Sequence, residues 1–230
     1  MTRAHRATVF DLDDTLIDTA DAWPRVCAAF TARHGHRWRA QDTAALHGNG
    51  GWASYVADLC GGAAGPAEVV EACTTAMLAE IAAGRVRALP GALALFREAA
   101  RHGPVAVATA SPRRFVDAVL QQLGLAAQLT AVVCAEDVPR PKPAPDPYLR
   151  ATAQLGIPPS ACLAVEDSPN GIRSASAAGL SILAIPRAFT PLPADIAPLA
   201  SAHARDASAA LPLLTLLLAP HPERLLRAPS

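Results

Sequence analysis

Short apolar runs alternate along most of the chain with segments that have the apolar spacing of helices. The runs contain Val, Ile and Ala without polar alternation, which is typical of strands buried on both faces of a sheet. Five of them are expected to be parallel strands: Ala7–Phe10, Val105–Ala108, Ala131–Cys134, Cys162–Val165 and Ile182–Ile185. The alternation of these strands with helices predicts an α/β fold built on a doubly wound parallel sheet.

Proline, glycine and hydroxyl residues mark the expected ends of the helices between these strands. Ser111 is expected to be an N-cap, with Pro112 at the first helical position and Gly124 after the last turn. The other apolar stretch of note, Ala207–Ala219, is too short to span a bilayer and predicts a packed C-terminal helix. The remaining helices are expected over Ala92–Arg101, Pro112–Leu123, Pro147–Leu155 and Asn170–Ala178.

The stretch from about Ile17 to Arg87 departs from the alternation because it contains helical patterns only. These patterns cover Ala20–Arg33, Ala40–Leu46, Trp52–Leu59 and Ala67–Ala83. We therefore expect residues 17–87 to form a helical cap, inserted into a core made of residues 1–16 and 88–230. Such an insert would lie at the carboxyl edge of the sheet, where it could close over a site and exclude water.

Composition narrows the function classes. The chain has 230 residues, of which 51% are apolar, and its 20 basic and 20 acidic residues cancel. It therefore has no basic stripe that would indicate nucleic acid. Five scattered cysteines without a paired spacing indicate reduced thiols. We expect a cytoplasmic bacterial protein, a monomer or weak homodimer, with no signal peptide and no membrane or nucleic-acid partner.

Asp11 and Asp13 follow the first apolar run, in Val-Phe-Asp-Leu-Asp-Asp-Thr-Leu. Residues spaced i, i+2 on a strand point the same way, so both carboxylates would reach the edge where open α/β sheets bind ligands. Two like charges there need compensation, and carboxylate oxygens suit Mg²⁺. An Asp–Mg²⁺ pair beside a second Asp also combines a nucleophile with a general acid, as phosphoryl transfer through an aspartyl-phosphate requires.

Three further strand ends carry polar residues. Thr109 precedes a helix N-terminus and could donate to a phosphate oxygen or simply cap the helix. Lys142, the only lysine, stands among prolines that would hold its ammonium rigidly, although a solvated loop lysine is the alternative. Glu166 and Asp167 could complete a Mg²⁺ site with Asp11, or Asp167 or Ser168 could cap the next helix.

In chain order, four strand ends thus present Asp/Asp, Thr, Lys and Glu/Asp, and with these residues the sequence resembles the haloacid dehalogenase superfamily of phosphotransferases. Phe10–Leu16 matches its DxDxT motif, Thr109 and Lys142 match the second and third motifs, and Val165–Ser168 matches the fourth. The resemblance spans roughly residues 7–187. It implies a Rossmann-like core, and the helical insert resembles the C1 cap of the β-phosphoglucomutase-like branch.

The resemblance also implies a role for each motif residue. Asp11 would attack phosphorus, and Asp13 would protonate the leaving oxygen and then activate water. Mg²⁺ would be held by Asp11, the Asp13 backbone carbonyl and Asp167, with Glu166 as a ligand or a neighbour of the ligands. The residues implied around the transferring phosphoryl group are Thr109, Ala110 and Lys142.

Four functions compete on this scaffold: a phosphatase, a β-phosphoglucomutase-like mutase, a dehalogenase or phosphonatase, and a non-catalytic binding protein. The mutase branch carries a cap histidine where this chain has Trp23, and His47 and Gly51 stand near the places of its cap lysine and arginine. A dehalogenase would not need Asp13, and a phosphonatase would need a cap lysine. A binding protein would usually have lost a catalytic residue. We expect a Mg²⁺-dependent phosphatase acting on a small phosphate ester, such as a sugar or polyol phosphate.

The glycine-rich segment 47–52 is expected to face the site when the cap closes. We hypothesise that four cap residues line the pocket for the leaving group, namely Trp23, His47, Asn49 and Trp52. The alternative is a flexible cap joint with Trp52 in the core of the cap. The segment is not a P-loop, because no Gly-Lys-Ser/Thr follows it. Sugar phosphates, polyol phosphates, phosphoglycolate and nucleoside monophosphates all remain open as substrates.

Overall fold

One parallel sheet of six strands organises the part of the chain that the computed structural model describes, residues 5–187 and 192–219. The strands are β1 (Ala7–Phe10), β4 (Val105–Ala108), β5 (Ala131–Val133), β6 (Cys162–Glu166), β7 (Ser181–Ala184) and β8 (Ala202–His203). Their order is β5-β4-β1-β6-β7-β8, so the chain builds one half of the sheet outward from β1 and then returns beside β1 to build the other. This order is that of a doubly wound sheet and confirms the expected fold class.

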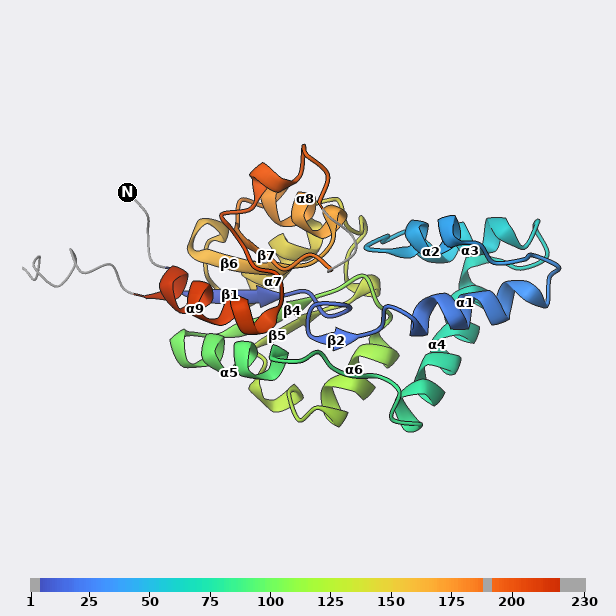
Figure 1. Ribbon diagram of the computed structural model, residues 1–230, viewed down its shortest axis with the longest axis horizontal. Helices are drawn as coiled ribbons and strands as arrows, with labels where there is room; N and C mark the ends of the chain where they lie inside the picture. Colours follow the sequence, from blue (N-terminus) through green and yellow to red (C-terminus); the bar gives the residue numbers. More distant parts are fainter. Residues whose placement is uncertain (1–4, 188–191, 220–230) are drawn as a thin grey trace, which may run out of the picture.

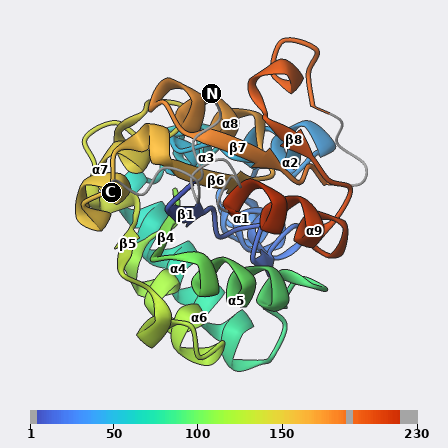
Figure 2. The same cartoon turned by 90° about the vertical axis from the view of Figure 1, so that its left-hand side faces the viewer.

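Helices cover both faces of the sheet (Figure 2). On one face lie α5 (Ala92–His102), α6 (Arg113–Gln122) and α9 (Ala207–Leu218), and on the other lie α7 (Asp146–Leu155) and α8 (Pro169–Ala177). The strand residues are therefore buried whichever way they point. Phe10 joins the apolar cluster that extends into the cap, whereas Val9 joins the cluster under α7 and α8.

The expected helix start near Ser111 is wrong in detail. Helix α6 begins at Arg113, and Pro112 is its N-cap, with φ −65° and ψ 143°. The Ser111 hydroxyl does not cap the helix, because it donates to the Asp13 carboxylate instead, at 2.6 Å. A tertiary contact has thus replaced the local one that the sequence indicated.

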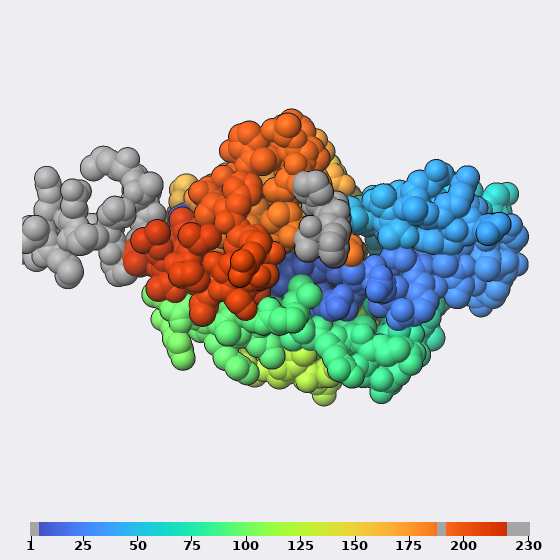
Figure 3. Space-filling model, in the orientation of Figure 1, coloured from blue at the N-terminus to red at the C-terminus, as the bar shows by residue number. Residues whose placement is uncertain are grey.

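The cap contains four helices: α1 (Ala22–Ala32), α2 (Ala40–Leu46), α3 (Trp52–Leu59) and α4 (Pro66–Ala82). They lie together at one end of the molecule, beyond the carboxyl ends of the core strands (Figure 1), and form a separate lobe beside the core (Figure 3). The expectation of helices alone was wrong, since β2 (Ile17–Asp18) and β3 (Arg87–Ala88) pair antiparallel where the chain enters and leaves the cap. Strands of two residues are too short to produce a recognisable pattern.

Two further expectations concern the cysteines and the apolar helices. All five cysteines are buried and none forms a disulfide: Cys27, Cys60, Cys73, Cys134 and Cys162. Within residues 5–187 and 192–219, no helix has both the length and the apolar character needed to cross a bilayer. The expected core range of 1–16 and 88–230 includes residues 1–4, 188–191 and 220–230, which lie outside the described residues.

Candidate active site

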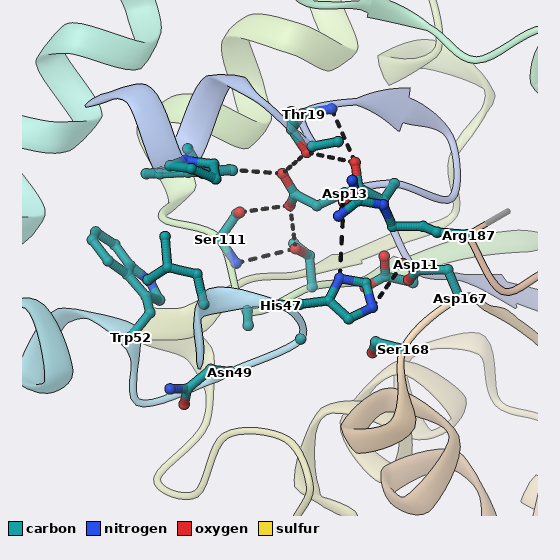
Figure 4. A pocket seen from close by; sticks show the side chains of 18 of the residues that line it. Asp11, Asp13, Thr19, His47, Asn49, Trp52, Ser111, Asp167, Ser168 and Arg187 are labelled. Atoms are coloured by element: carbon teal, nitrogen blue, oxygen red, sulfur yellow. Dashed lines mark hydrogen bonds and ion pairs between the residues drawn. The ribbon is translucent and has the colours of Figure 1, made fainter. Parts of the chain in front are cut away.

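A cavity of about 90 Å³ lies where the carboxyl ends of β1, β4 and β6 face the cap (Figure 4). Its lining combines the motif residues of the core with residues of α1 and of the loop between α2 and α3. Ligand sites in doubly wound sheets form at this edge, beside the strand from which the chain order reverses. Ala110, expected at the phosphoryl group, is among the lining residues.

Lys142 is buried between two carboxylates. Its Nζ atom lies 2.6 Å from Asp11 Oδ1 and 2.6 Å from Glu166 Oε1. Burial lowers the pKa of Lys142, but the charges of Asp11 and Glu166 outweigh this effect and raise it above its usual value. The pKa of Asp11 is also raised, first by burial, against the lowering effect of Lys142. The lysine is therefore charged and tied to the proposed nucleophile, which excludes the solvated-loop alternative.

The two oxygens of Glu166 already have hydrogen-bond donors. Oε1 accepts from Lys142 and from the Tyr148 hydroxyl at 2.9 Å, and Oε2 accepts from the backbone N–H groups of Asp167 and Ser168 at 3.0 and 3.1 Å. Gly171 provides the space for this arrangement, because a Cβ there would overlap the Glu166 carboxylate. The contacts of Glu166 hold Lys142 and the turn after β6 in place.

Asp167 differs from Glu166, because only one of its two carboxylate oxygens accepts a hydrogen bond. Its Oδ1 accepts from the Thr15 hydroxyl at 3.3 Å, whereas its buried Oδ2 has no hydrogen-bond partner. Burial raises the pKa of Asp167, and the charges of Asp11 and Glu166 raise it further. Oxygens of these three carboxylates lie within 4.8 Å of one another. A buried carboxylate oxygen without a partner, beside a second carboxylate, fits a divalent cation well.

Asp13 is held by four donors from both lobes. Its Oδ1 accepts from Thr19 Oγ1 and Trp23 Nε1, each at 2.9 Å, and its Oδ2 accepts from Ser111 Oγ at 2.6 Å and Thr109 Oγ1 at 3.3 Å. Figure 4 shows the Asp13 carboxylate pointing toward Thr19 and Ser111. Sequence reasoning found Thr109 but missed Thr19 and Ser111, because single hydroxyl residues beside a strand end carry no distinctive pattern.

The four expected cap residues all line the cavity. Trp52 also packs against Trp23, with ring centroids 5.1 Å apart, so it belongs both to the lining and to the core of the cap. The amide of Asn49 serves its own loop, since Nδ2 donates to the Ala45 carbonyl at 2.9 Å and Oδ1 accepts from the Gly51 N–H at 2.8 Å. Its polar atoms are thus less available to a ligand than expected.

His47 reaches from the cap into a charged group of the core. Its ring nitrogens lie 3.9 Å from Asp14 Oδ2 and 3.6 Å from Asp167 Oδ2. Arg187 approaches the same Asp14 oxygen at 3.3 Å. Burial raises the pKa of Asp14 to about 6, and burial and Arg187 lower the pKa of His47. Arg187 was missed because the segment after Pro186 is rich in Ala, Pro and Leu and has no motif.

The cap is closed over the site. A Cβ on Gly48 would lie 2.6 Å from the Ser168 side chain, and a Cβ on Gly50 would overlap Pro141 and lie 2.8 Å from the Lys142 carbonyl oxygen. Only glycine permits contacts this close at these positions. The cap loop therefore rests directly on the two core segments that carry Lys142 and Asp167.

Comparison with known proteins agrees with this arrangement. Residues 5–179 match the family model of haloacid dehalogenase-like hydrolases. Protein CbbY of Rhodobacter capsulatus is 36% identical over 197 residues, which cover 80% of this chain and 87% of that protein. Hexitol phosphatase A of Escherichia coli is 35% identical over 181 residues, covering 77% and 81%. The crystal structure of CbbY from Rhodobacter sphaeroides in complex with phosphate has a TM-score of 0.78, at 27% identity, covering 90% of this chain and 96% of that one.

Proposed function

Since the chain belongs to the haloacid dehalogenase-like hydrolases, in their phosphoglucomutase-like branch, we propose that it is a Mg²⁺-dependent phosphatase acting on a sugar or polyol phosphate through an aspartyl-phosphate. That the chain is a phosphomonoester hydrolase follows from its relatives. The observation that carries the rest is the buried group of Asp11, Lys142 and the Asp167 oxygen that accepts no hydrogen bond. The relative named a hexitol phosphatase supports a polyol or sugar leaving group.

The carboxylates of Asp11 and Asp167, with the Asp13 backbone carbonyl, are the groups that would hold Mg²⁺. Both oxygens of Glu166 already accept hydrogen bonds, so of its two expected roles we favour the neighbour that positions Lys142. When bound, the metal would draw negative charge from the phosphoryl oxygens and from the Asp11 carboxylate.

The protein residues then divide the chemistry between them. A carboxylate oxygen of Asp11 attacks phosphorus while the bond to the leaving oxygen breaks, and Asp13 gives that oxygen its proton. Water next attacks the aspartyl-phosphate and passes its proton to Asp13, which frees Asp11 and phosphate. The Lys142 ammonium stabilises the charge on the transferring group, with Thr109 and Ala110 at its side.

The test is a phosphate-release assay with Mg²⁺ over a panel of hexitol, pentose, hexose and triose phosphates. We expect release from a sugar or polyol phosphate, loss of release in EDTA, and background release by Asp11→Asn, whose far-UV circular dichroism should remain that of the folded wild type. Asp58→Asn, the same change at an exposed position of α3, is the control and should keep wild-type activity. Turnover by Asp11→Asn would contradict the nucleophile assignment.

The same panel tests the mutase alternative. Glucose 1-phosphate supplied with a bisphosphate activator would give glucose 6-phosphate without phosphate release if the chain were a mutase. We expect no such product, because Trp23 stands where the mutase branch has a histidine.

A further inference from the structure

The two oxygens of the Asp13 carboxylate differ in the kind of donor they face. Oδ1 accepts from the Trp23 indole and the Thr19 hydroxyl, whereas Oδ2 accepts from the hydroxyls of Ser111 and Thr109. An indole N–H can only donate, while a hydroxyl can rotate and accept instead. If Asp13 were protonated on Oδ1, that proton would point at the N–H of the indole and repel it. If Asp13 were protonated on Oδ2, a neighbouring hydroxyl could rotate and accept the proton in a hydrogen bond.

The indole is fixed independently of Asp13. The ring of Trp23 packs against Trp52, at a centroid distance of 5.1 Å, and against Phe115, at 5.3 Å with the planes 67° apart. Trp23 comes from α1 of the cap, and Phe115 comes from α6 of the core. Because aromatic packing holds the ring, the direction of the N–H is set before Asp13 is considered.

We propose that Trp23 is a positioning residue that makes Oδ2 the oxygen through which Asp13 transfers its proton. This inference rests on the proposed function. The O–H bond at Asp13 Oδ2 breaks and a new O–H bond forms on the leaving oxygen, as the P–O bond breaks and leaves its electron pair there. In the second half of the reaction, a proton of the attacking water returns to Oδ2.

A comparison of two leaving groups tests the proposal. An alkyl phosphate from the panel must receive a proton as it leaves, whereas acetyl phosphate and p-nitrophenyl phosphate release stable anions and need none. In Trp23→Phe, we expect kcat/KM for the alkyl phosphate to fall about 10- to 100-fold and that for the two activated substrates to stay within about twofold. The ratio kcat/KM reports only the steps up to leaving-group departure, so the later attack of water does not enter it.

The controls separate this role from packing. Trp38→Phe also removes an indole hydrogen bond within the cap, from Trp38 Nε1 to Thr43 Oγ1 at 3.0 Å. It should leave kcat/KM unchanged for the alkyl phosphate and for the activated substrates. Trp23→His keeps a ring N–H group and should recover part of the lost alkyl-phosphate activity. If Trp23→Phe does not fold, Trp23→Tyr, whose hydroxyl can rotate and accept, must show the same selective loss.

If Trp23→Phe lowered kcat/KM equally for the alkyl phosphate and for the activated substrates, the proposal would be overturned, because such a result would show a structural role. Unchanged activity on the alkyl phosphate would overturn it as well. Failure of the proposed function looks different, since the wild-type protein itself would then release no phosphate from any ester.

Discussion

At the scale of single residues, Lys142 is a buried cation held between carboxylates. It is only 3% exposed and lies between two buried carboxylates. Removing one partner of a buried ionic group leaves uncompensated charge, which is far more destabilising than loss of an exposed pair.

We therefore predict that Lys142→Met, which is similar in size but uncharged, lowers the free energy of unfolding by roughly 3–5 kcal/mol and abolishes turnover. Urea unfolding followed by circular dichroism measures the loss. Arg173→Met is the matched control, because Arg173 pairs with Asp195 on the surface, where we expect at most about 1 kcal/mol. A change as small in Lys142→Met as in the control would show that the buried charges do not depend on the lysine.

Individual residues were predictable from the sequence where a motif marked a strand end. Asp11 and Glu166 stand directly after apolar runs, with Asp167 next in the chain, so the edge of the sheet brings these three carboxylates together. Thr19 and Arg187 were not predictable, because their contacts depend on the path of the chain into the cap and on how it returns from β7 to the site.

At the scale of elements, the loop between α2 and α3 makes the closest contact between cap and core. Gly50 has no positive φ, so its requirement for glycine comes from space alone. A methyl group there would overlap Pro141 and the Lys142 carbonyl oxygen.

Gly50→Ala should therefore prevent full closure without disturbing either lobe. We predict a fall in kcat/KM of about tenfold, equivalent to about 1.4 kcal/mol, with little change in melting temperature. Gly65→Ala is the control, since a Cβ at Gly65 meets no atom within 4 Å. Wild-type kinetics in Gly50→Ala would mean that the closed contact is not needed for turnover.

The helices of the cap illustrate what periodicity can predict. The limits of α2 and α3 agree with the sequence interpretation, and those of α1 and α4 differ by one or two residues. The β2–β3 pair and the closed position of the loop were not predictable, because both depend on contacts between residues far apart in the chain.

At the scale of the whole molecule, the acidic group of the site links metal binding to stability. Asp11 and Asp167 have raised pKa values because the fold buries them and places other carboxylates beside them, against the lowering effect of Lys142. Ligands that bind only the native state stabilise it according to their concentration and dissociation constant.

We predict that Mg²⁺ raises the melting temperature, with a stabilisation of about 2.7 kcal/mol when its concentration is 100 times the dissociation constant. Differential scanning fluorimetry with increasing Mg²⁺ after EDTA treatment measures this shift. Asp167→Asn should abolish the shift, whereas Asp195→Asn, at an exposed position, should preserve it. An equal shift in Asp167→Asn would place the cation elsewhere.

The whole architecture was predictable to the level of fold class. Uniformly apolar strands and the order of their connections determine a doubly wound sheet, and the two-sided burial of β1, β4 and β6 agrees with that interpretation. The order of the strands and the presence of β8 were not predictable, because the sequence of a strand does not determine which strand pairs with it.

The burial of the only lysine gives the protein a built-in site for chemical labelling, read by mass spectrometry. A succinimidyl ester has one ε-amine to modify in this chain, and that amine is buried. An ammonium held by Asp11 and Glu166 does not react with the ester, so label on the peptide containing Lys142 reports conformations in which these contacts are broken, without any engineered probe.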